Sequence, residues 1–272
     1  MKTSRESVNE LGISPNKALG QNFLIDESAI ERIVFSATAP LLPIIEIGPG
    51  LGALTLPLAE SGLPLAAIEL DSNLCSVLEG QLPKNAKVIN VDFMKADLSA
   101  IHQELGGGEL SVVGNLPYYI TSPICMRLVT SALPIRNMTL MMQKEAADRF
   151  TAQPKDKNYV PLTILARLRF DITSLLDLSP ASYYPQPDVA SRVLRFESRG
   201  FQLPSNLPRL LKCAFAMRRK TLVNNLSAMG LDRKTSASLL EKSDIPPSAR
   251  AEELSPEQFV SLAQALELEN SD

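Results

Sequence analysis

The stretch PIIEIGPGLG, residues 43–52, decides the fold class of this chain. A short apolar run comes first, a turn with three glycines follows, and residues 53–62 show the apolar spacing of a helix. Glycines let the backbone turn tightly and approach a ligand closely. We therefore predict a strand, a ligand-binding turn and a helix, with a plain connecting turn as the alternative interpretation.

The spacing of the glycines narrows the kind of ligand. Gly48, Gly50 and Gly52 form the pattern G-x-G-x-G, whereas a dinucleotide fingerprint reads G-x-G-x-x-G. The turn also contains no Lys, which a phosphate-binding P-loop requires. The pattern therefore argues against a dinucleotide oxidoreductase and against a nucleotide phosphate site.

Short apolar runs alternate with helical patterns over the first 200 residues, which indicates a mostly parallel, doubly wound α/β sheet with helices on both faces. The later runs lie in residues 64–70, 86–94, 110–120, 138–143 and 189–198. Residues 144–150 continue the fourth of these runs as a helix. Residues 161–172 fit either a strand or a buried helix.

The strand signal stops near Leu203, and the remaining segments have helical patterns. Ser255 is a suitable N-cap for the last of them, with Pro256 in the first helical position. We predict a catalytic domain over residues 1–200, of which 1–16 are a flexible lead-in. Residues 201–272 are predicted to form a small all-helical domain.

Composition excludes several classes of protein. The 272 residues carry a net charge of −3, yet residues 205–220 hold five basic side chains and no acidic one. No apolar run reaches the roughly 18–20 residues that span a bilayer, and the start of the chain lacks the features of a targeting peptide, so we expect a cytoplasmic protein. The three Cys are scattered and the single His102 is expected at a solvated helix end, so we predict neither a disulfide nor a metal site.

Acidic residues end two of the predicted strands. Glu69 follows the glycine turn by about 20 residues, where a carboxylate can accept hydrogen bonds from a ribose diol. Asp92 ends the next strand and could accept from an adenine amine, with Phe93 packed on the ring. A nucleoside without phosphate fits this set, and S-adenosylmethionine has that character. Glu46 would orient the turn or the methionine end, or else bond to backbone.

The sequence NLPY, residues 115–118, ends the predicted strand within residues 110–120 at the same edge of the sheet. The side-chain oxygen of Asn115 and the carbonyl of Leu116 can each accept one hydrogen of an adenine N6 amine, which is a poor nucleophile. Pro117 fixes the backbone, and Tyr118 can stack on the base. Catalysis would then consist of positioning and electrostatics, with no strong base.

Five motifs in order resemble the ribosomal RNA adenine N6-dimethyltransferases, and the resemblance covers nearly the whole chain. EIGPGLG and NLPY are joined by KALGQNFLID (17–26), YYPQPDVASRVLRF (183–196) and AFAMRRKTLVNNL (214–226). The last motif is similar to the KsgA-type (RsmA) branch, which acts on the small ribosomal subunit. The resemblance implies a Rossmann-like class I methyltransferase sheet with a helical rRNA-recognition domain. It also implies dimethylation of two adjacent adenines near the 3′ end of 16S rRNA, with S-adenosylhomocysteine as product and a role in subunit biogenesis.

The resemblance also assigns roles to particular residues. Asn22, Leu24, Gly48, Glu69, Asp92 and Asn115 would bind the methyl donor. Asn115, Leu116, Pro117 and Tyr118 would form the catalytic motif, and Tyr183 would press on the second face of the flipped adenine. The candidates for RNA contacts are Arg149, Lys155, Lys157, Arg218, Arg219 and Lys220. We expect a monomer, because the basic face has to stay open to RNA.

Departures from the family pattern and rival interpretations remain open at this point. Tyr119 stands where the KsgA-type pattern usually has Asn, and Ala216 and Met217 replace residues that are commonly polar. One rival is a macrolide-resistance methyltransferase acting on large-subunit rRNA, against which RRKTLVNNL and Leu116 argue. The other rival is a ribosome-assembly factor without catalysis, which would be indicated by loss of Asn115, Glu69 or the glycines.

Overall fold

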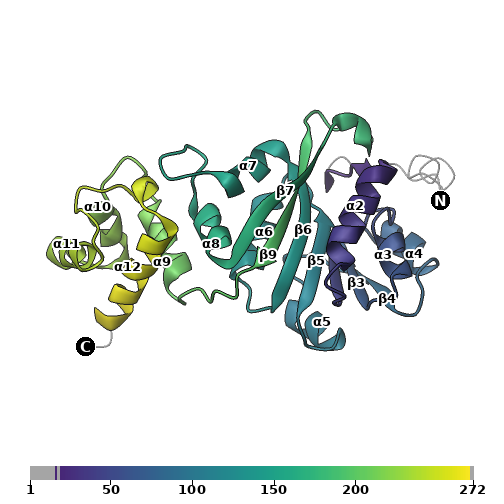
Figure 1. Ribbon diagram of the computed structural model, residues 1–272, viewed down its shortest axis with the longest axis horizontal. Helices are drawn as coiled ribbons and strands as arrows, with labels where there is room; N and C mark the ends of the chain where they lie inside the picture. Colours follow the sequence, from purple (N-terminus) through teal and green to yellow (C-terminus); the bar gives the residue numbers. More distant parts are fainter. Residues whose placement is uncertain (1–15, 17–18, 270–272) are drawn as a thin grey trace. The chain divides into compact units, whose positions relative to one another are not determined.

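The computed structural model describes residue 16 and residues 19–269, and these divide into two compact units. The first unit contains the chain up to Ala147 together with Ile172–Ser198 (Figure 1). The second unit contains Asp148–Asp171 and the chain from Arg199 onward. The boundary near residue 200 agrees with the predicted division, but residues 148–171 belong to the second unit and not, as predicted, to the first.

The larger of the two sheets among the described residues has seven strands, in the order β4-β3-β2-β5-β6-β9-β7. The strands are β2 (Ile44–Ile47), β3 (Leu65–Glu69), β4 (Ala86–Asn90), β5 (Leu110–Asn115), β6 (Ile135–Gln143), β7 (Phe170–Leu178) and β9 (Ser191–Ser198). The pairs β3–β4, β2–β3, β2–β5 and β5–β6 are parallel, and β9 joins β6 antiparallel. The predicted, mostly parallel α/β sheet is confirmed.

The helices of this unit fall on both faces of the sheet. They are α2 (Glu27–Thr38), α3 (Thr55–Glu60), α4 (Ser72–Glu79), α5 (Leu98–Glu104) and α6 (Thr121–Thr130), and α7 (Lys144–Thr151) begins in this unit and ends in the second. The chain runs outward from β2 to β3 and β4 on one side, and from β5 to β6 on the other. Because such crossovers are right-handed, α3 and α4 lie on the face opposite to α6. α2 packs across β5 and β6 (Figure 1).

The strand order reverses between β2 and β5, and this reversal fixes where a ligand can bind. In an open α/β sheet the crevice lies outside the carboxyl ends of the strands at this switch point. Ile47 of β2 pairs with Gly114 of β5, so Gly48 and Asn115 leave the sheet side by side. The sequence motifs EIGPGLG and NLPY therefore begin at one point in space.

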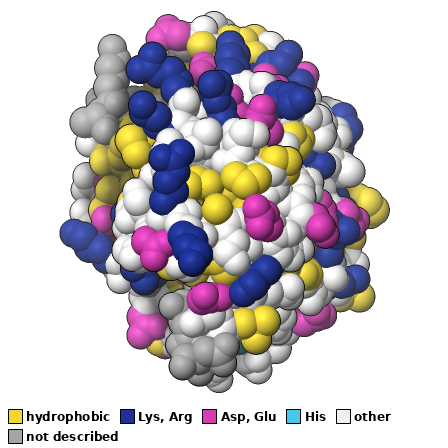
Figure 2. All heavy atoms as spheres, turned by 90° about the vertical axis from the view of Figure 1, so that its left-hand side faces the viewer, with side chains coloured by type: hydrophobic (Ala, Val, Ile, Leu, Met, Phe, Trp, Pro, Cys, Tyr) yellow, Lys and Arg dark blue, Asp and Glu magenta, His cyan; other side chains and the backbone are white. Residues whose placement is uncertain are grey.

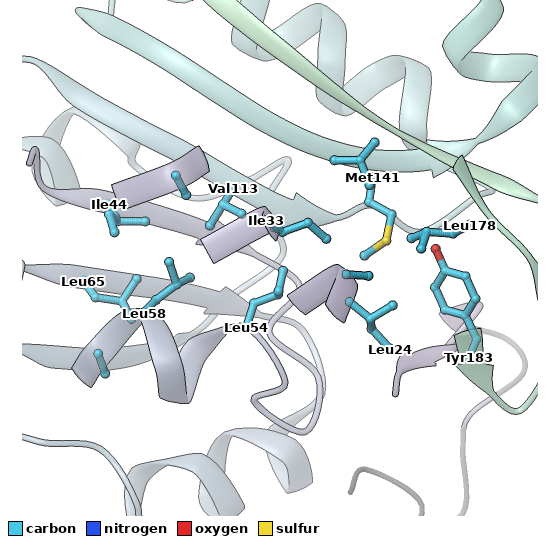
Figure 3. Close-up of a cluster of buried hydrophobic side chains, with 14 residues drawn as sticks. Leu24, Ile33, Ile44, Leu54, Leu58, Leu65, Val113, Met141, Leu178 and Tyr183 are labelled. Carbon is cyan, nitrogen blue, oxygen red and sulfur yellow. The ribbon is translucent and has the colours of Figure 1, made fainter. Parts of the chain in front are cut away.

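The buried core beneath this crevice contains apolar side chains from the strands and from α2 and α3. Ile44, Leu65 and Val113 contribute from parallel strands, as expected for a sheet that is covered on both faces (Figure 3). A short antiparallel pair closes one end of the core, formed by β1 (Phe23–Leu24) and β8 (Tyr183–Tyr184). This pair fixes the N-terminal segment against the sheet.

The described part of the second unit is helical. Its helices are α8 (Pro161–Arg169), α9 (Leu207–Ala214), α10 (Leu222–Leu226), α11 (Arg233–Lys242) and α12 (Pro256–Glu269). α12 contacts α8, α9 and α11. Phe215 lies between the rings of Tyr159 and Phe259, with ring centroids 6.3 Å and 5.9 Å apart, and the Tyr159 hydroxyl donates to the Leu254 carbonyl at 2.9 Å. The predicted helical domain is thus present, with α8 as an added member.

Three local predictions can be compared with this unit. Residues 161–172 form a helix and then the start of a strand, so each of the two alternatives applies to part of the segment. Ser255 caps α12, because its hydroxyl accepts from the Gln258 N–H at 3.3 Å. The helical pattern after residue 205 is interrupted after Ala214 and resumes at Leu222. None of the helices that the structure describes is long and apolar enough to cross a membrane.

Candidate functional site

A pocket opens at the switch point of the sheet, and it is lined by four segments distant in sequence. These are residues 19–24, the end of β2 with the glycine turn, the end of β3 with the start of α4, and residues 115–119. The lining residues include Asn22, Leu24, Gly48, Glu69 and Asn115, all predicted for the donor site. Leu116, Pro117 and Tyr118 line the same pocket. Other lining residues had not been predicted from the sequence pattern, namely Leu19, Gln21, Leu51, Leu70 and Leu74.

The glycine turn needs glycine at the positions that face the pocket. Gly48 has φ of +66°, and a Cβ on it would lie 3.5 Å from the carbonyl oxygen of Asn115. Gly50 has φ of +59°, and a Cβ on it would lie 3.0 Å from the ring of Phe23. L-residues with a side chain rarely adopt this left-handed conformation. The turn therefore presents bare backbone to the pocket.

Glu69 is held at the end of β3 by backbone N–H groups. Its Oε1 accepts from Leu70 and Asp71 at 2.8 and 2.9 Å, and its Oε2 accepts from Gly50 at 3.1 Å. Burial raises the pKa of Glu69, and these N–H groups oppose that rise because they stabilise the carboxylate. A carboxylate can accept about four hydrogen bonds, so it keeps capacity for a ligand hydroxyl.

Glu46 lines the pocket from inside β2 and is only 1 % exposed. Burial, reinforced by the nearby charge of Glu69, raises the pKa of Glu46 to about 8. Its Oε2 has no hydrogen-bond partner among the described residues. A buried polar atom without a partner is costly, so this oxygen is a natural acceptor or donor for a bound ligand. The sequence left its role open between turn, ligand and backbone.

The NLPY segment is fixed from several directions. The Asn115 Nδ2 donates to the Asn22 carbonyl at 2.9 Å, which connects it to the N-terminal segment. The Leu116 N–H donates to the Met141 carbonyl at 2.9 Å, and the Pro117 carbonyl accepts from the Thr121 hydroxyl at 3.0 Å. The Asn115 Oδ1 and the Leu116 carbonyl accept no hydrogen bond from the described residues. Two acceptors are thus held next to the glycine turn.

Tyr118 stands beside these acceptors in a half-buried position. Its hydroxyl lies 2.8 Å from the Ser191 hydroxyl on β9. Burial raises the pKa of Tyr118, and the hydrogen bond to Ser191 opposes this rise. The phenol therefore remains neutral, and its ring is held in one orientation at the pocket wall.

The structure corrects the role predicted for Tyr183. Its ring is 1 % exposed and packs with Leu24, Met141 and Leu178 in the core (Figure 3). Strand pairing with Leu24 places this side chain on the inner face of the short sheet. A buried ring has no face for a flipped base to stack on, so Tyr183 supports the site from beneath.

Asp92 and Phe93 also differ from expectation. Neither residue is among those that line the pocket. The Asp92 Oδ1 accepts from the Met94 N–H at 2.9 Å, so this carboxylate closes a local turn after β4. Phe93 is buried under the guanidinium of Arg127, which lies 5.3 Å from the ring centroid.

The single histidine is buried, so the expected solvated position was wrong. His102 is 7 % exposed within α5, and its Nε2 lies 2.7 Å from the Gly108 carbonyl. This contact holds the glycine-rich turn that follows the helix. Within residues 16 and 19–269, no group of three or more His, Cys, Asp or Glu side chains is arranged to hold a metal.

The predicted RNA-binding cations all lie in the second unit, and they differ in their surroundings. Lys155, Lys157, Arg219 and Lys220 are exposed. Arg218 instead pairs with Glu252 at 2.8 Å and donates to the carbonyl of Lys157 at 2.8 Å. It therefore joins the 155–157 loop to the 215–221 loop, a structural role that was not predicted for it. Arg149 is half-buried, and its carbonyl accepts from Thr163 at 2.7 Å.

Figure 2 faces the second unit and shows many Lys and Arg side chains with Asp and Glu between them. Positive and negative side chains are thus intermixed on this face. This distribution agrees with the net charge of −3 for the whole chain.

The fold and pocket together define a Rossmann-like class I methyltransferase. The structure is similar to a dimethyladenosine transferase from Plasmodium falciparum, with a TM-score of 0.72, 23% identity and coverage of 91% of this chain and 98% of the other. It is also similar to the 23S rRNA methyltransferase ErmE, with a TM-score of 0.63, 25% identity and coverage of 90% and 100%.

Sequence comparison gives the family. The model of the family described as ribosomal RNA adenine dimethylase matches residues 12–268. The Ribosomal RNA small subunit methyltransferase A of Geobacillus sp. (strain WCH70) is 38% identical, over 97% of this chain and 96% of that protein. The chain belongs to the ribosomal RNA adenine dimethylase family, which confirms the resemblance found in its five motifs.

Proposed function

We propose that this enzyme transfers methyl groups from S-adenosylmethionine to the N6 amines of two adjacent adenosines near the 3′ end of 16S rRNA. The substrate would be the small ribosomal subunit in the cytoplasm, where the reaction would accompany subunit biogenesis. The observation that carries the proposal is the placement of the Asn115 and Leu116 acceptors in the same pocket as the glycine turn and Glu69.

The donor side of the pocket suits S-adenosylmethionine. Its described lining includes the carboxyl groups of Glu46 and Glu69 and no Lys or Arg, which fits a cationic nucleoside better than a phosphate ester. Gly48 gives close backbone approach, Glu69 would accept from the ribose hydroxyls, and Asn22 and Leu24 would close the site from the N-terminal segment. When bound, the donor supplies an electrophilic methyl group on a sulfonium and leaves as S-adenosylhomocysteine.

The acceptor side suits an aromatic amine. The Asn115 Oδ1 and the Leu116 carbonyl would each accept one N6 hydrogen, which orients the nitrogen lone pair toward the methyl carbon. Pro117 has no N–H and a fixed φ, so it keeps the Leu116 carbonyl aimed. Tyr118 would stack on the base, whose removal from its stack costs a few kcal/mol.

The reaction requires no side chain to remove a proton from the N6 amine before the methyl group is transferred. The N–C bond forms as the C–S bond breaks, and the methylated amine then loses one proton to water. Burial raises the pKa values of Glu46 and Tyr118, so both groups hold their protons near neutral pH and neither is free to accept one. Catalysis would come from orientation and from fixed dipoles.

RNA binding would use the second unit. Lys155, Lys157, Arg219 and Lys220 are exposed and can contact phosphates, which position a nucleic acid without reading its sequence. Arg218 would act on RNA only indirectly, by holding two of these loops. The enzyme would act as a monomer, which light scattering of the free protein can test.

The alternatives are less well supported. Identity of 38% over 97% of this chain to a protein named for the small subunit favours the small subunit over large-subunit, resistance-type methylation. Asn115, Glu69 and the glycines are present and gathered at one pocket, which argues against a factor without catalysis.

The test is methyl transfer to defined substrates. The enzyme and Asn115→Ala are incubated with labelled S-adenosylmethionine and small subunits from cells that lack the modification. N6,N6-dimethyladenosine at two neighbouring 3′ positions, lost in Asn115→Ala, is the expected result. Label on large-subunit RNA alone would support the resistance-type alternative, and binding without label would support a factor without catalysis.

A further inference from the structure

Tyr119 is a large aromatic side chain at the pocket that the mechanism above does not use. It lines the pocket and is 60 % exposed, whereas its neighbour Tyr118 is half-buried and bonded to Ser191. Exposed apolar side chains are common on protein surfaces, and Phe35 on α2 is an example. Tyr119 differs from Phe35 because it lies at a site built for a nucleoside and a base.

The ring of Tyr119 is backed by the chain on one side. A Cβ placed on Gly20 would lie 3.6 Å from the Tyr119 Cδ1 and 4.0 Å from its Cε1. Gly20 has φ of +61°, a conformation that favours glycine. The N-terminal segment therefore supports the ring with bare backbone, and the rest of the ring is left to solvent.

The order of residues along the NLPY segment leads from the inside of the pocket to its mouth. Leu116 is buried, Pro117 and Tyr118 are half-buried, and Tyr119 is exposed. A target amine at the Asn115 and Leu116 acceptors is thus inside, and the nucleotide joined to it lies at the mouth. When a base leaves its stack, its neighbour is left with an unstacked face.

We propose that Tyr119 stacks on the base next to the adenosine that is being methylated. This inference rests on the proposed function and adds a substrate-binding residue to it. Because the two target adenosines are adjacent, the base on Tyr119 is the other target of the pair during methylation of one of them. A supported ring with a free face is the feature that proteins use to bind unstacked bases.

The first experiment compares Tyr119→Ala with Tyr119→Phe, using Phe35→Ala as the matched loss of an exposed aromatic ring. Equilibrium binding to unmodified small subunits is measured with S-adenosylhomocysteine present. Stacking predicts binding weaker by about 10-fold or more in Tyr119→Ala, and by at most about twofold in Tyr119→Phe. Phe35→Ala should bind as the unchanged protein does. Equal binding by Tyr119→Ala, or an equal loss in Tyr119→Phe, would overturn the proposal.

Binding of S-adenosylhomocysteine alone separates stacking from a structural role. A ring that only supports Gly20 and the donor pocket would weaken this binding as much as it weakens subunit binding. Stacking on RNA leaves the Kd for S-adenosylhomocysteine within about twofold of the unchanged protein. If Tyr119 stacks on RNA, Tyr119→Ala raises KM for the subunit in steady-state methylation and leaves kcat nearly unchanged.

The second experiment removes the stacking partner from the RNA. Subunits are assembled with an abasic nucleotide in place of one of the two adenosines, and methylation of the other is measured. The unchanged enzyme should lose as much kcat/KM as Tyr119→Ala loses on intact RNA, and Tyr119→Ala should lose little more. Additive losses would show that Tyr119 and the neighbouring base do not interact.

The two proposals fail in different ways. If the unchanged enzyme binds small subunits and transfers no methyl group, the proposed function fails, and the binding comparison still decides whether Tyr119 contacts RNA. If the enzyme methylates both adenosines and Tyr119→Ala behaves as Phe35→Ala does, the proposed function stands and the stacking role is rejected.

Discussion

At the scale of single residues, Glu69 is sensitive to a change of one atom, because N–H groups bond to both of its oxygens. In Glu69→Gln one oxygen becomes an NH2 group, which faces a donor instead of accepting from it. A hydrogen bond from a ribose hydroxyl to a charged carboxylate contributes about 1.5–3 kcal/mol, so we expect its weakening to raise the Kd for S-adenosylhomocysteine about tenfold or more. Calorimetry measures this, with Glu60→Gln on the exposed surface of α3 as control. Unchanged affinity would exclude Glu69 from the donor site.

The raised pKa of Glu46 predicts how the free energy of unfolding depends on pH. Its pKa is about 8 in the folded protein against an ordinary value of 4.5, so the folded state keeps a proton that the unfolded state releases between these values. The free energy of unfolding therefore falls as pH rises through this window, by at most about 1.4 kcal/mol per pH unit. Glu46→Gln removes this contribution and should flatten the dependence, while the raised pKa of Glu69 leaves a remainder of the same sign.

Urea unfolding across this pH window measures the change in slope for Glu46→Gln. The control is Glu60→Gln, which replaces a carboxyl group on the exposed surface of α3. The control should keep the slope of the unchanged protein. An equally steep slope in Glu46→Gln would show that Glu46 does not carry the proton.

At the scale of elements, the approach of β5 to β2 at the switch point depends on Gly114. A Cβ on Gly114 would lie 2.7 Å from the Ile47 carbonyl oxygen and 3.0 Å from the Ile47 Cβ. The strands would have to move apart, so Gly114→Ala should lower the free energy of unfolding by about 1–3 kcal/mol. It should also weaken S-adenosylhomocysteine binding, because Gly48 and Asn115 follow directly. Gly108→Ala, where nothing lies within 4 Å, is the control, and equal stability of the two variants would contradict the prediction.

The contacts of Arg218 predict that this side chain stabilises two loops of the second unit. Its guanidinium contacts Glu252 and the carbonyls of Asp156 and Lys157, a fork that Lys cannot reproduce. The Lys155 N–H donates to the Glu252 carbonyl at 2.7 Å in the same network. In Arg218→Lys we expect loss of about 0.5–1.5 kcal/mol of local stability, seen as faster hydrogen exchange of amides 155–158. Arg219→Lys, on an exposed side chain, should leave this exchange unchanged.

The elements also show what sequence could predict and what it could not. The strands β2 to β6, β9 and Asn115 at a strand end were predicted because hydrophobic period and strand order act locally or by simple rules. β7 was not, because the pattern of residues 161–172 fitted a strand or a helix. The orientation of Tyr183 depends on its pairing with Leu24, which lies far away in sequence, so local pattern did not contain it. Asp92 lies outside the lining of the pocket and closes a turn through the Met94 N–H, which the position of an acid at a strand end did not reveal. His102 was expected in solvent because its neighbours are polar, yet the turn after α5 folds back on it.

Arg218 illustrates the same limit for charge. A run of Arg and Lys in sequence indicates a basic surface, but it does not say which side chain bonds to protein. The partners of Arg218 lie in segments about 30 and 60 residues away in sequence, and only the fold brings them together. The break between α9 and α10 has a similar origin, since the Asn225 side chain bonds to both backbone groups of Met217.

At the scale of the whole molecule, a chain with net charge of −3 has to bind RNA through a few local cations. Counterion release then predicts that each phosphate contact adds about 0.7–0.9 to the slope of log K against log salt. Lys155 and Lys157 are exposed on one loop, so the double change to Gln should lower the slope by about 1.5 if both contact phosphate. Affinity at a fixed low salt should fall in parallel, while binding of S-adenosylhomocysteine stays unchanged.

The matched control for this last prediction is a double change of Lys84 and Lys95 to Gln, two exposed lysines of the first unit. It alters net charge by the same amount, so a general effect of charge would appear equally in both proteins. Binding to small subunits is measured from about 50 to 200 mM salt, where phosphate contacts change affinity strongly. A lower slope only in the Lys155 and Lys157 variant would place phosphate on that loop. Equal slopes in both would mean that the second unit holds RNA through other groups, with Arg219 and Lys220 as the next pair to change.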